Sequence, residues 1–405
     1  MLRVLYNAGP GNAFETFQRW QDQERDLVNS HVAYSGQMLE ACARRGAALM
    51  ITCTHEGGEE QRHGNVKIVP RTDLSRGKSG ISYHRSIAAK ALQNIRDAID
   101  FNADVLIISE DSNPSHYQAL LQRGVRIVQS LHTRLWIDGR KPSFLQRLRL
   151  KGFAKAYSSG EISVLSASDV ITEQVAALTK GKMPPVLEFL PLYYPEHYAD
   201  IPPPALDPSR LDIMFIGRIE ENKGVFDLVS IAHLLRARNT DFRFQICGEG
   251  SALDRMRKKV SDQNLERYFL FHGWCDRDRL RAVMTQCQAT IVPTRSDFVE
   301  GFNQVIVESV LAHRPIIASD MCPAVSYVGE AAVMVKADDI QGYADAISNL
   351  SHDMGALAGH IRACTGAGRR FLDPDYSFAT ALDEVFSAVK EKRAVRTRRI
   401  DPKAL

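Results

Sequence analysis

Short apolar runs alternate with helical patterns along the whole of this 405-residue chain, in two successive sets. Uninterrupted apolar runs are typical of strands buried on both faces, and their alternation with helices predicts parallel sheets covered on both sides. In the first half we expect helices over 36–45 and 86–101. The predicted strands are 2–6, 48–53, 66–70, 104–109, 125–130 and 169–172 in the first half, and 212–217, 242–248, 268–273, 289–293, 314–319 and 332–336 in the second.

The segment IPPPALDPSR, residues 201–210, separates the two sets and contains four prolines. Proline cannot continue a helix or a central strand, so this segment is predicted to be an interdomain linker. The fold class is therefore α/β, with two Rossmann-like doubly wound domains facing an interdomain cleft. The expected domains are 1–200 and 211–375, followed by a closing helix over 376–392 that could return to the first domain, and a basic, disordered tail over 393–405.

Composition and cysteine content indicate the class of protein and the compartment to expect. Apolar content of 44% and charged content of 24% are typical of a soluble globular protein, and a net charge of +3 does not indicate a nucleic-acid partner. The seven cysteines include no C-x-x-C pair, which favours a reducing compartment over a disulfide framework or a zinc site. The N-terminal apolar stretch is too short for a signal peptide and no run is long enough to span a membrane, so we expect a cytoplasmic protein.

Two loops of the second half carry residues suited to a phosphorylated ligand. In FIGRIEENKG, residues 215–224, a strand is followed by Arg218 and Lys223, whose cations suit a phosphate or diphosphate. The alternative is a solvated loop with two surface charges.

The second loop, Glu300-Gly301-Phe302-Asn303, precedes an apolar helix that contains Glu308. A glycine at a helix start lets an anion approach the free backbone amides. The Glu308 carboxylate needs donors in such a helix, and the two hydroxyls of a ribose could supply them. Alternatively, Glu308 pairs with a buried arginine or caps another backbone segment.

Together these loops resemble the family 4 retaining glycosyltransferases, which have the two-Rossmann GT-B fold. Their donor domain pairs a strand–G-R-x(4)-K-G loop with an E-G-F-G-x(4)-E element, the E-x7-E motif. CGEGSAL (247–253) and HGWCDRDRL (272–280) also resemble the family's G-x-G-x-x-L turn and its base-pocket segment, which adds Gly248 and Gly273 to the donor site. The residues that match the two loops are Gly217, Arg218, Lys223, Gly224, Glu300, Gly301, Phe302 and Glu308.

The first half resembles the family more loosely. Residues 34–53 are similar to its glycine turn, helix and strand, with Gly36 on the acceptor side. His132, in SLHTRLW, is similar to its strand-end histidine, although a purely structural role stays open, and 167–172 resembles its last strand before the hinge. The chain departs from the family where Asn303 replaces the second glycine of E-G-F-G, and where an insertion within 7–33 would lie over the acceptor side.

The resemblance implies a retaining, metal-independent transfer of a sugar from a nucleotide diphosphate sugar to a hydroxyl acceptor, either a sugar or a lipid-linked one, in polysaccharide or glycolipid synthesis. No cofactor, metal or nucleic acid is implied. A nucleotide-sugar epimerase and a non-catalytic two-domain sugar-binding protein are the alternatives. The resemblance implies that Arg218 and Lys223, with the amides of Gly301 and Asn303, neutralise the departing diphosphate. It implies that Glu300 binds hydroxyls of the sugar and that Glu308 binds the ribose. His132 is implied to contact the sugar near its reacting carbon.

Two further segments allow more than one interpretation. Residues 140–157 carry six cations and no acid, interleaved with apolar residues. They could lie on anionic lipid at the inner face of a membrane, present cations to an anionic acceptor, or form a solvated helix face. Asp276 and Asp278 form a D-x-D, but Asp before an amphipathic helix is typical of an N-cap, which we favour over a metal site.

Overall fold

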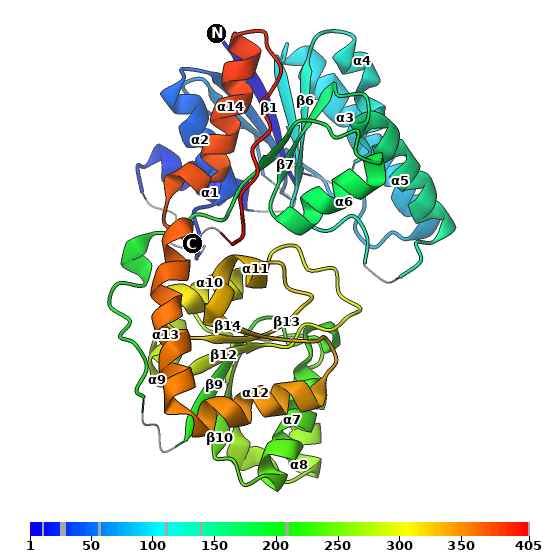
Figure 1. Ribbon diagram of the computed structural model, residues 1–405. Helices are drawn as coiled ribbons and strands as arrows, with labels where there is room; N and C mark the ends of the chain where they lie inside the picture. The colour runs from blue at the N-terminus through cyan, green and yellow to red at the C-terminus, as the bar shows by residue number, and fades with distance from the viewer. Residues whose placement is uncertain are drawn as a thin grey trace. The chain divides into compact units, whose positions relative to one another are not determined.

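The computed structural model describes residues 1–9, 12–24, 30–55, 58–109, 112–137, 140–206 and 210–403. The chain divides into two compact units (Figure 1). Unit 1 comprises Met1–Leu192 and Asp373–Ile400, and unit 2 comprises Tyr193–Leu372 together with the chain end from Asp401. The boundary therefore precedes the proline-rich segment 201–210, of which residues 207–209 lie outside the described residues.

Unit 1 is built on an eight-stranded sheet with the order β3-β4-β2-β1-β5-β6-β7-β8. All neighbouring strands are parallel except β3, which pairs antiparallel with β4 at the edge. The strand order reverses between β1 and β5. The strands are β1 (Arg3–Gly9), β2 (Ala48–Thr54), β3 (Gln61–His63), β4 (Val66–Arg71), β5 (Val105–Ile108), β6 (Arg126–Leu131), β7 (Ile162–Ser166) and β8 (Val186–Glu188).

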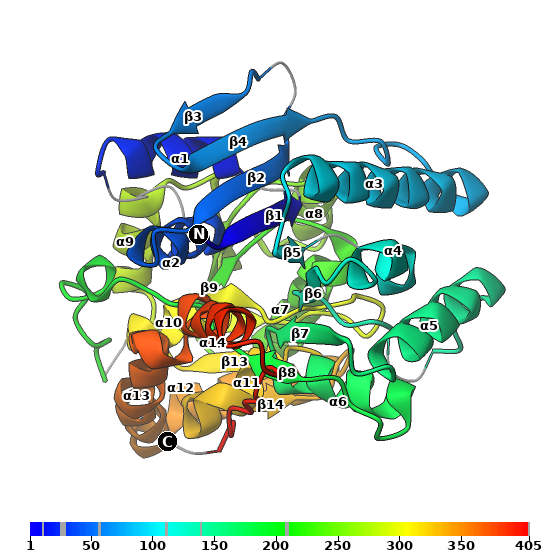
Figure 2. The same ribbon diagram turned by 90° about the horizontal axis from the view of Figure 1, so that it is seen from above.

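Helices cover this sheet, and strands β5 and β7 are buried along their whole length between them (Figure 2). Helix α14 packs against α2, where the Arg45 guanidinium binds the Asp383 carboxylate at 2.8 Å and Gln37 accepts from the Ala379 amide at 3.0 Å. The helices are α1 (Ala13–Gln21), α2 (Tyr34–Arg44), α3 (Gly80–Asp100), α4 (Gln118–Leu121), α5 (Phe144–Tyr157), α6 (Asp169–Thr179) and α14 (Phe378–Lys390), with the short 3-10 turns η1 (Pro114–Tyr117) and η7 (Pro374–Tyr376).

Two predictions for unit 1 are wrong. Residues 169–172 are not a strand but the first turn of α6, because the Ser168 hydroxyl caps the helix by accepting from the Ile171 amide. The last strands before the unit boundary are instead β7 and β8.

The tail predicted to be disordered is also ordered from residue 393 to residue 403. Val395 and Ile400 are each 5% exposed, so the tail has the apolar contacts that its basic sequence seemed to lack. The Ile400 amide and the Arg399 guanidinium both bind the carboxylate of Glu188, each at 2.6 Å. Residues 393–400 thereby become part of unit 1 beside β8, whereas the chain from Asp401 belongs to unit 2.

Unit 2 is built on a six-stranded, wholly parallel sheet with the order β11-β10-β9-β12-β13-β14. Numbered within the unit, this is the order 3-2-1-4-5-6 of a Rossmann domain, which reverses between β9 and β12. The strands are β9 (Leu211–Ile216), β10 (Phe242–Cys247), β11 (Phe269–Gly273), β12 (Ala289–Val292), β13 (Ile316–Ser319) and β14 (Ala332–Val335).

The core of unit 2 lies between this sheet and helices such as α7, which packs against α12. Pro202 is fixed to the unit because its carbonyl accepts from the fully buried guanidinium of Arg314 at 2.6 Å. The helices are α7 (Val225–Ala237), α8 (Leu253–Asp262), α9 (Arg277–Gln286), α10 (Gln304–Leu311), α11 (Ala324–Val328), α12 (Ile340–His352) and α13 (Met354–Gly368), with 3-10 turns η2 (Pro195–His197), η3 (Glu221–Lys223), η4 (Glu266–Tyr268), η5 (Gly329–Ala331) and η6 (Arg369–Phe371).

None of the helices in the described residues is long and apolar enough to cross a membrane. The seven cysteines are free thiols.

Candidate functional site

The candidate site lies in unit 2, at the carboxyl edge of the sheet where the strand order reverses. Strands β9 and β12 are neighbours there, but the chain leaves them toward opposite sides of the sheet. Such a divergence leaves a crevice between the two loops and is the general ligand position in open parallel sheets. Lys223 lies in the loop after β9, and Glu300 lies in the loop after β12.

Three glycines bring the backbones of adjacent strand ends together at this edge. The Gly217 amide donates to the Cys247 carbonyl at 3.0 Å, and the Gly248 amide donates to the Gly273 carbonyl at 2.7 Å. Gly248 has a φ of 141°, and a Cβ there would overlap the carbonyl oxygen of Gly217. The ends of β9, β10 and β11 are therefore linked, and this edge carries little side-chain bulk.

The loop that carries Lys223 is held against the end of β12. Gly224 has a φ of 75°, and a Cβ at this position would overlap the carbonyl oxygen of Pro293. Next to this contact, the Arg295 amide donates to the Asn222 carbonyl at 3.0 Å. Arg295 also binds the Asp227 carboxylate of α7 at 2.7 Å. These contacts fix the register between the two loops.

The result is a close ion pair between the two predicted site residues. Lys223 Nζ lies 2.6 Å from Glu300 Oε2 and 4.0 Å from the centroid of the Phe298 ring. The side chains are 17% and 11% exposed, so water screens this pair less than a surface pair. Thr294 Oγ1 also donates to Oε2 at 3.5 Å, whereas Oε1 takes no part in these bonds.

Asn303 is the fourth polar group at this position, after Lys223, Glu300 and Thr294. Its Nδ2 donates to Glu300 Oε2 at 3.2 Å and contacts Cys322 Sγ at 3.6 Å. Its Oδ1 is buried and has no hydrogen-bond partner among the described residues. The φ of Asn303 is 76°, the left-handed conformation that glycine adopts freely and asparagine tolerates. The asparagine therefore keeps the backbone turn that a glycine would give before α10.

Glu308 lies within α10 and is 7% exposed. Glu308 interacts with a neighbouring group, so its carboxylate is not an isolated buried charge. The pKa of the Tyr198 hydroxyl is raised well above its usual range, first by burial and second by the negative charge of Glu308. Glu308 is thus part of a buried polar region that includes Tyr198, and its contact with a ribose stays a prediction.

The other predicted donor residues differ in their accessibility. The side chain of Phe302 is 8% exposed and packs at 5.5 Å from the Tyr327 ring and 6.2 Å from the Phe371 ring. Only its backbone can therefore meet a ligand. Arg218 is exposed after β9, and within the described residues its guanidinium forms no ion pair. Gly301 is buried between Glu300 and Phe302.

Of the two candidate residues of unit 1, His132 belongs to an aromatic cluster. The His132 ring lies 4.8 Å from the Tyr34 ring and 5.6 Å from the Phe189 ring, and its Nε2 is 2.9 Å from Ser130 Oγ. Burial, with His31 adding to it, lowers the pKa of His132 to about 4, so the imidazole is neutral at pH 7. Gly36 lies two residues after Tyr34 in the first turn of α2.

The structure brings Lys223 and Glu300 together as the sequence predicts, and it adds groups that the sequence did not reveal. Thr294 and Phe298 were missed because a threonine and a phenylalanine in a loop resemble ordinary loop residues. The motif suggests a role for the backbone amide of Asn303 but none for its side chain, which binds Glu300 in the structure. Asp276 is the N-cap of α9 and accepts from the Arg279 amide at 2.8 Å, as predicted.

Comparison with known proteins gives a family match for this unit. Residues 210–353 match a family model described as "Glycosyl transferases group 1". A glycogen synthase of Mycobacterium tuberculosis is 27% identical over 184 residues, which are 44% of this chain and 43% of that protein. A 2-deoxystreptamine N-acetyl-D-glucosaminyltransferase of Niallia circulans is 28% identical over 135 residues, 33% of this chain and 34% of that protein. The matched region spans less than half the length of these relatives.

Solved structures show the same fold over nearly the whole chain. A sucrose-phosphate synthase from Thermosynechococcus elongatus has a TM-score of 0.71 at 14% identity and covers 97% of this chain and 100% of that one. HepE from Anabaena, solved in complex with UDP, has a TM-score of 0.65 at 13% identity and covers 97% and 100%. These comparisons confirm the predicted fold class of two Rossmann-like domains, as in GT-B glycosyltransferases.

Proposed function

We propose that this protein is a retaining glycosyltransferase that moves a sugar from a nucleotide diphosphate sugar to a hydroxyl acceptor, without a metal ion. The observation that carries the proposal is the Lys223–Glu300 pair at the reversal of the unit 2 sheet, within the segment that matches the group 1 glycosyl transferase model. A nucleotide diphosphate sugar has an anionic diphosphate and a sugar rich in hydroxyls. The Lys223 cation suits the diphosphate, and the Glu300 carboxylate can accept hydrogen bonds from the sugar hydroxyls.

Lys223 and Arg218 are the proposed diphosphate ligands. The bond to the departing diphosphate breaks as negative charge grows on its oxygen, and a preorganised cation stabilises that charge in the transition state. Lys223 is preorganised by Glu300 and the Phe298 ring, whereas the exposed Arg218 is free to swing onto the ligand. These two side chains are proposed to supply the neutralising charge that a metal would otherwise provide.

Glu300 and Asn303 are the proposed sugar ligands. Glu300 Oε2 already receives Lys223 and Asn303, which leaves Oε1 to accept from a sugar hydroxyl. The buried, unpartnered Oδ1 of Asn303 would become a second acceptor beside it once the side chain turns this oxygen toward the ligand. Gly217, Gly248, Gly273 and Gly301 would allow the ligand to approach the backbone, and Glu308 would bind the ribose.

The assignments for unit 1 complete the proposal. A neutral His132 would donate or accept a hydrogen bond at the sugar, and Gly36 would lie on the acceptor side. The acceptor is a sugar or lipid-linked hydroxyl in polysaccharide or glycolipid synthesis, with 140–157 making the contact with a membrane. The free cysteines fit a cytoplasmic location.

A panel of nucleotide sugars, each incubated with the full chain in the presence of a chelator, tests this proposal. We expect slow release of the nucleoside diphosphate from one donor, and an α-to-α or β-to-β outcome by NMR once an acceptor is found. An epimerase would interconvert the donor sugar without releasing the diphosphate. A binding protein would bind a donor and leave it intact, and either result would overturn the proposal.

A further inference from the structure

A second surface, on unit 1, combines exposed apolar side chains with cations and plays no part in the proposed reaction. Helices α3 and α5 lie on the same side of unit 1 in both views (Figures 1 and 2), and both pack against η1. We call residues 78–87 and 140–151 the α3–α5 face. Ile81, Phe144 and Leu148 on this face are 66%, 72% and 59% exposed. Large apolar side chains this exposed in one place indicate a binding surface.

The charge of this face has one sign. No Asp or Glu occurs over 74–96 or over 140–160, although the whole chain has a net charge of only +3. Lys90 is paired with Asp73 at 2.9 Å, but six exposed cations on the face form no ion pair with the described residues. These six are Lys78, Arg85, Arg140, Lys141, Arg147 and Lys151.

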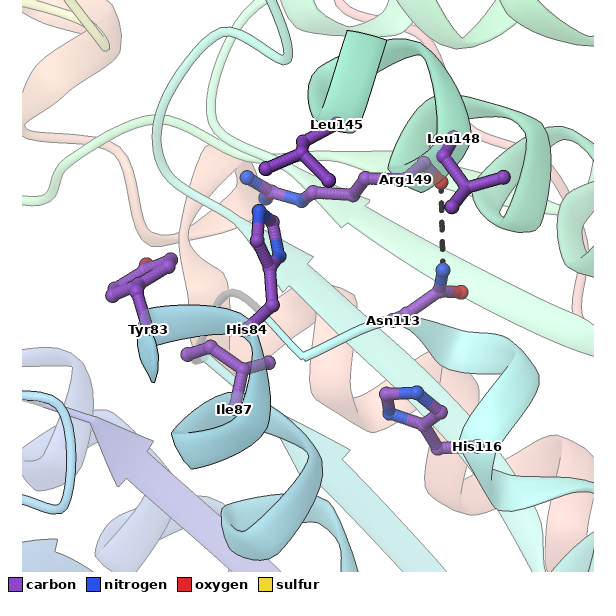
Figure 3. Close-up of a pocket in the computed structure, with 8 residues that line it drawn as sticks. All are labelled: Tyr83, His84, Ile87, Asn113, His116, Leu145, Leu148 and Arg149. Atoms are coloured by element: carbon purple, nitrogen blue, oxygen red, sulfur yellow. Dashed lines mark hydrogen bonds between the residues drawn. The ribbon is translucent and has the colours of Figure 1, made fainter. Parts of the chain in front are cut away.

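A pocket of about 240 Å³ lies between the two helices. Its apolar wall is formed by Ile87, Leu145 and Leu148, and its polar groups come from Tyr83, His84, Asn113, His116 and Arg149. Figure 3 shows Arg149 and His84 pointing toward one another across the pocket, and Asn113 Nδ2 donating to the Arg149 carbonyl, at 3.4 Å. The Ser143–Gln146 capping box fixes the start of α5 and so the position of the exposed turn.

We propose that the α3–α5 face docks on a bilayer of anionic phospholipid, with Ile81, Phe144 and Leu148 entering the interface and one headgroup phosphate held beside Arg149 in the pocket. Cations beside exposed apolar side chains match such an interface, which offers negative charge outside and hydrocarbon beneath. A soluble polyanion would use the cations but would gain nothing from the exposed Ile81, Phe144 and Leu148, and a nucleic-acid base could stack on Phe144 but would gain little from the aliphatic Ile81 and Leu148. Docking deepens the proposed contact through 140–157 but does not depend on sugar transfer, so its failure would leave the proposed reaction untouched.

Flotation of the full chain with lipid vesicles tests the docking, in the absence of any sugar donor. We expect binding to phosphatidylcholine vesicles that contain about 30% phosphatidylglycerol, weaker binding in about 0.5 M NaCl, and little binding to phosphatidylcholine alone. No binding to the anionic vesicles, or equal binding to both kinds, would overturn the proposal.

Paired variants separate the lipid surface from other anionic partners. Phe144→Ala/Leu148→Ala should lower vesicle affinity about tenfold or more, because two exposed apolar side chains lose their contact with the hydrocarbon. Its control, Met334→Ala/Leu270→Ala, removes two exposed apolar side chains of unit 2 and should bind as the wild type does. Arg147→Glu/Lys151→Glu should also lose vesicle binding. Its control, Arg362→Glu/Lys258→Glu, changes the net charge by the same amount in unit 2 and should bind as the wild type does. Full vesicle binding by Phe144→Ala/Leu148→Ala in a folded protein would contradict docking.

The headgroup contact has its own measurement. Calorimetry with dihexanoyl phosphatidylglycerol, kept below its micelle concentration, should show binding that falls about tenfold in Arg149→Met. Inorganic phosphate should bind far more weakly, because it lacks the part that fills the apolar wall. Equal affinity for phosphate would assign the pocket to a free anion and overturn the lipid assignment, as would unchanged lipid binding in Arg149→Met.

Discussion

Asn303 shows how a single side chain supports the proposed site in two ways. Its left-handed backbone turns the chain into α10, and its amide binds the carboxylate of Glu300. Asn303→Gly should keep the turn, and Asn303→Ala should cost about 1–2 kcal/mol more in the free energy of unfolding, because alanine disfavours a positive φ. Urea unfolding of both variants measures this difference. Equal stability of the two would show that the backbone turn carries no strain.

The buried imidazole of His132 makes the stability of the protein depend on pH. Its folded pKa, about 4, lies below the usual value of 6.5, so the unfolded chain binds the proton more strongly. The stability that neutral His132 contributes is present above pH 6.5 and is lost as the pH falls toward 4. The loss should be about 3 kcal/mol, and His132→Gln should remove it from the difference between unfolding at pH 7 and at pH 4. An unchanged pH dependence in His132→Gln would contradict a buried neutral imidazole.

At the scale of elements, the close approach of the β9–α7 loop to the end of β12 places Lys223. Gly224→Ala must both hold a positive φ and displace the Pro293 carbonyl, so we expect a loss of more than about 2 kcal/mol in unfolding free energy and a large fall in activity. Gly160→Ala is its control, because Gly160 has the same φ of 75° and open space at the Cβ position. A loss of stability in Gly224→Ala no larger than in Gly160→Ala would show that the loop contact is not tight.

The C-terminal tail is the second element with a measurable role. Truncation after Lys392 removes the buried Val395 and Ile400 and leaves the Glu188 carboxylate without its tail partners. Burial already raises the pKa of Glu188, so an unpaired charge there is costly. We expect the truncation to lower the stability of unit 1 by about 3 kcal/mol or more, and Glu188→Gln to restore part of it. An unchanged melting transition would indicate that the tail contributes nothing to unit 1.

Individual strands, helices and the tail show what could and could not be predicted from the sequence. The strands of unit 2 follow from their apolar runs, because the runs of the inner strands β9, β10, β12 and β13 are buried on both faces, whereas those of the edge strands β11 and β14 are partly exposed. Residues 169–172 fit a strand or a helix by sequence, because so short a segment with two apolar residues is compatible with both, and the Ser168 cap decides for a helix. The order of the tail could not be predicted, since its few apolar residues find their contacts only once β8 has formed.

For the molecule as a whole, the sequence predicted two Rossmann-like domains and placed Lys223 and Glu300 at one strand edge. It could not predict that the two side chains form an ion pair, because that depends on how Gly224 seats one loop against the other. Nor did it reveal the pocket between α3 and α5, whose lining comes from three separate segments. Motifs thus pointed to the candidate residues, while tertiary contacts determined which of them meet.

The central claim is that Lys223 binds the diphosphate and Glu300 binds the sugar of one donor. Calorimetry with UDP, GDP, ADP and TDP, followed by turnover of the matching nucleotide sugar, measures the two roles separately. Lys223→Ala should weaken nucleoside diphosphate binding by about 10- to 100-fold, since it removes one charge-assisted contact. Glu300→Gln should leave that affinity nearly unchanged and still lower turnover by a similar or larger factor, and Lys258→Ala, an exposed charge on α8, should change neither. Unchanged diphosphate affinity in Lys223→Ala, with the fold intact, would contradict the account.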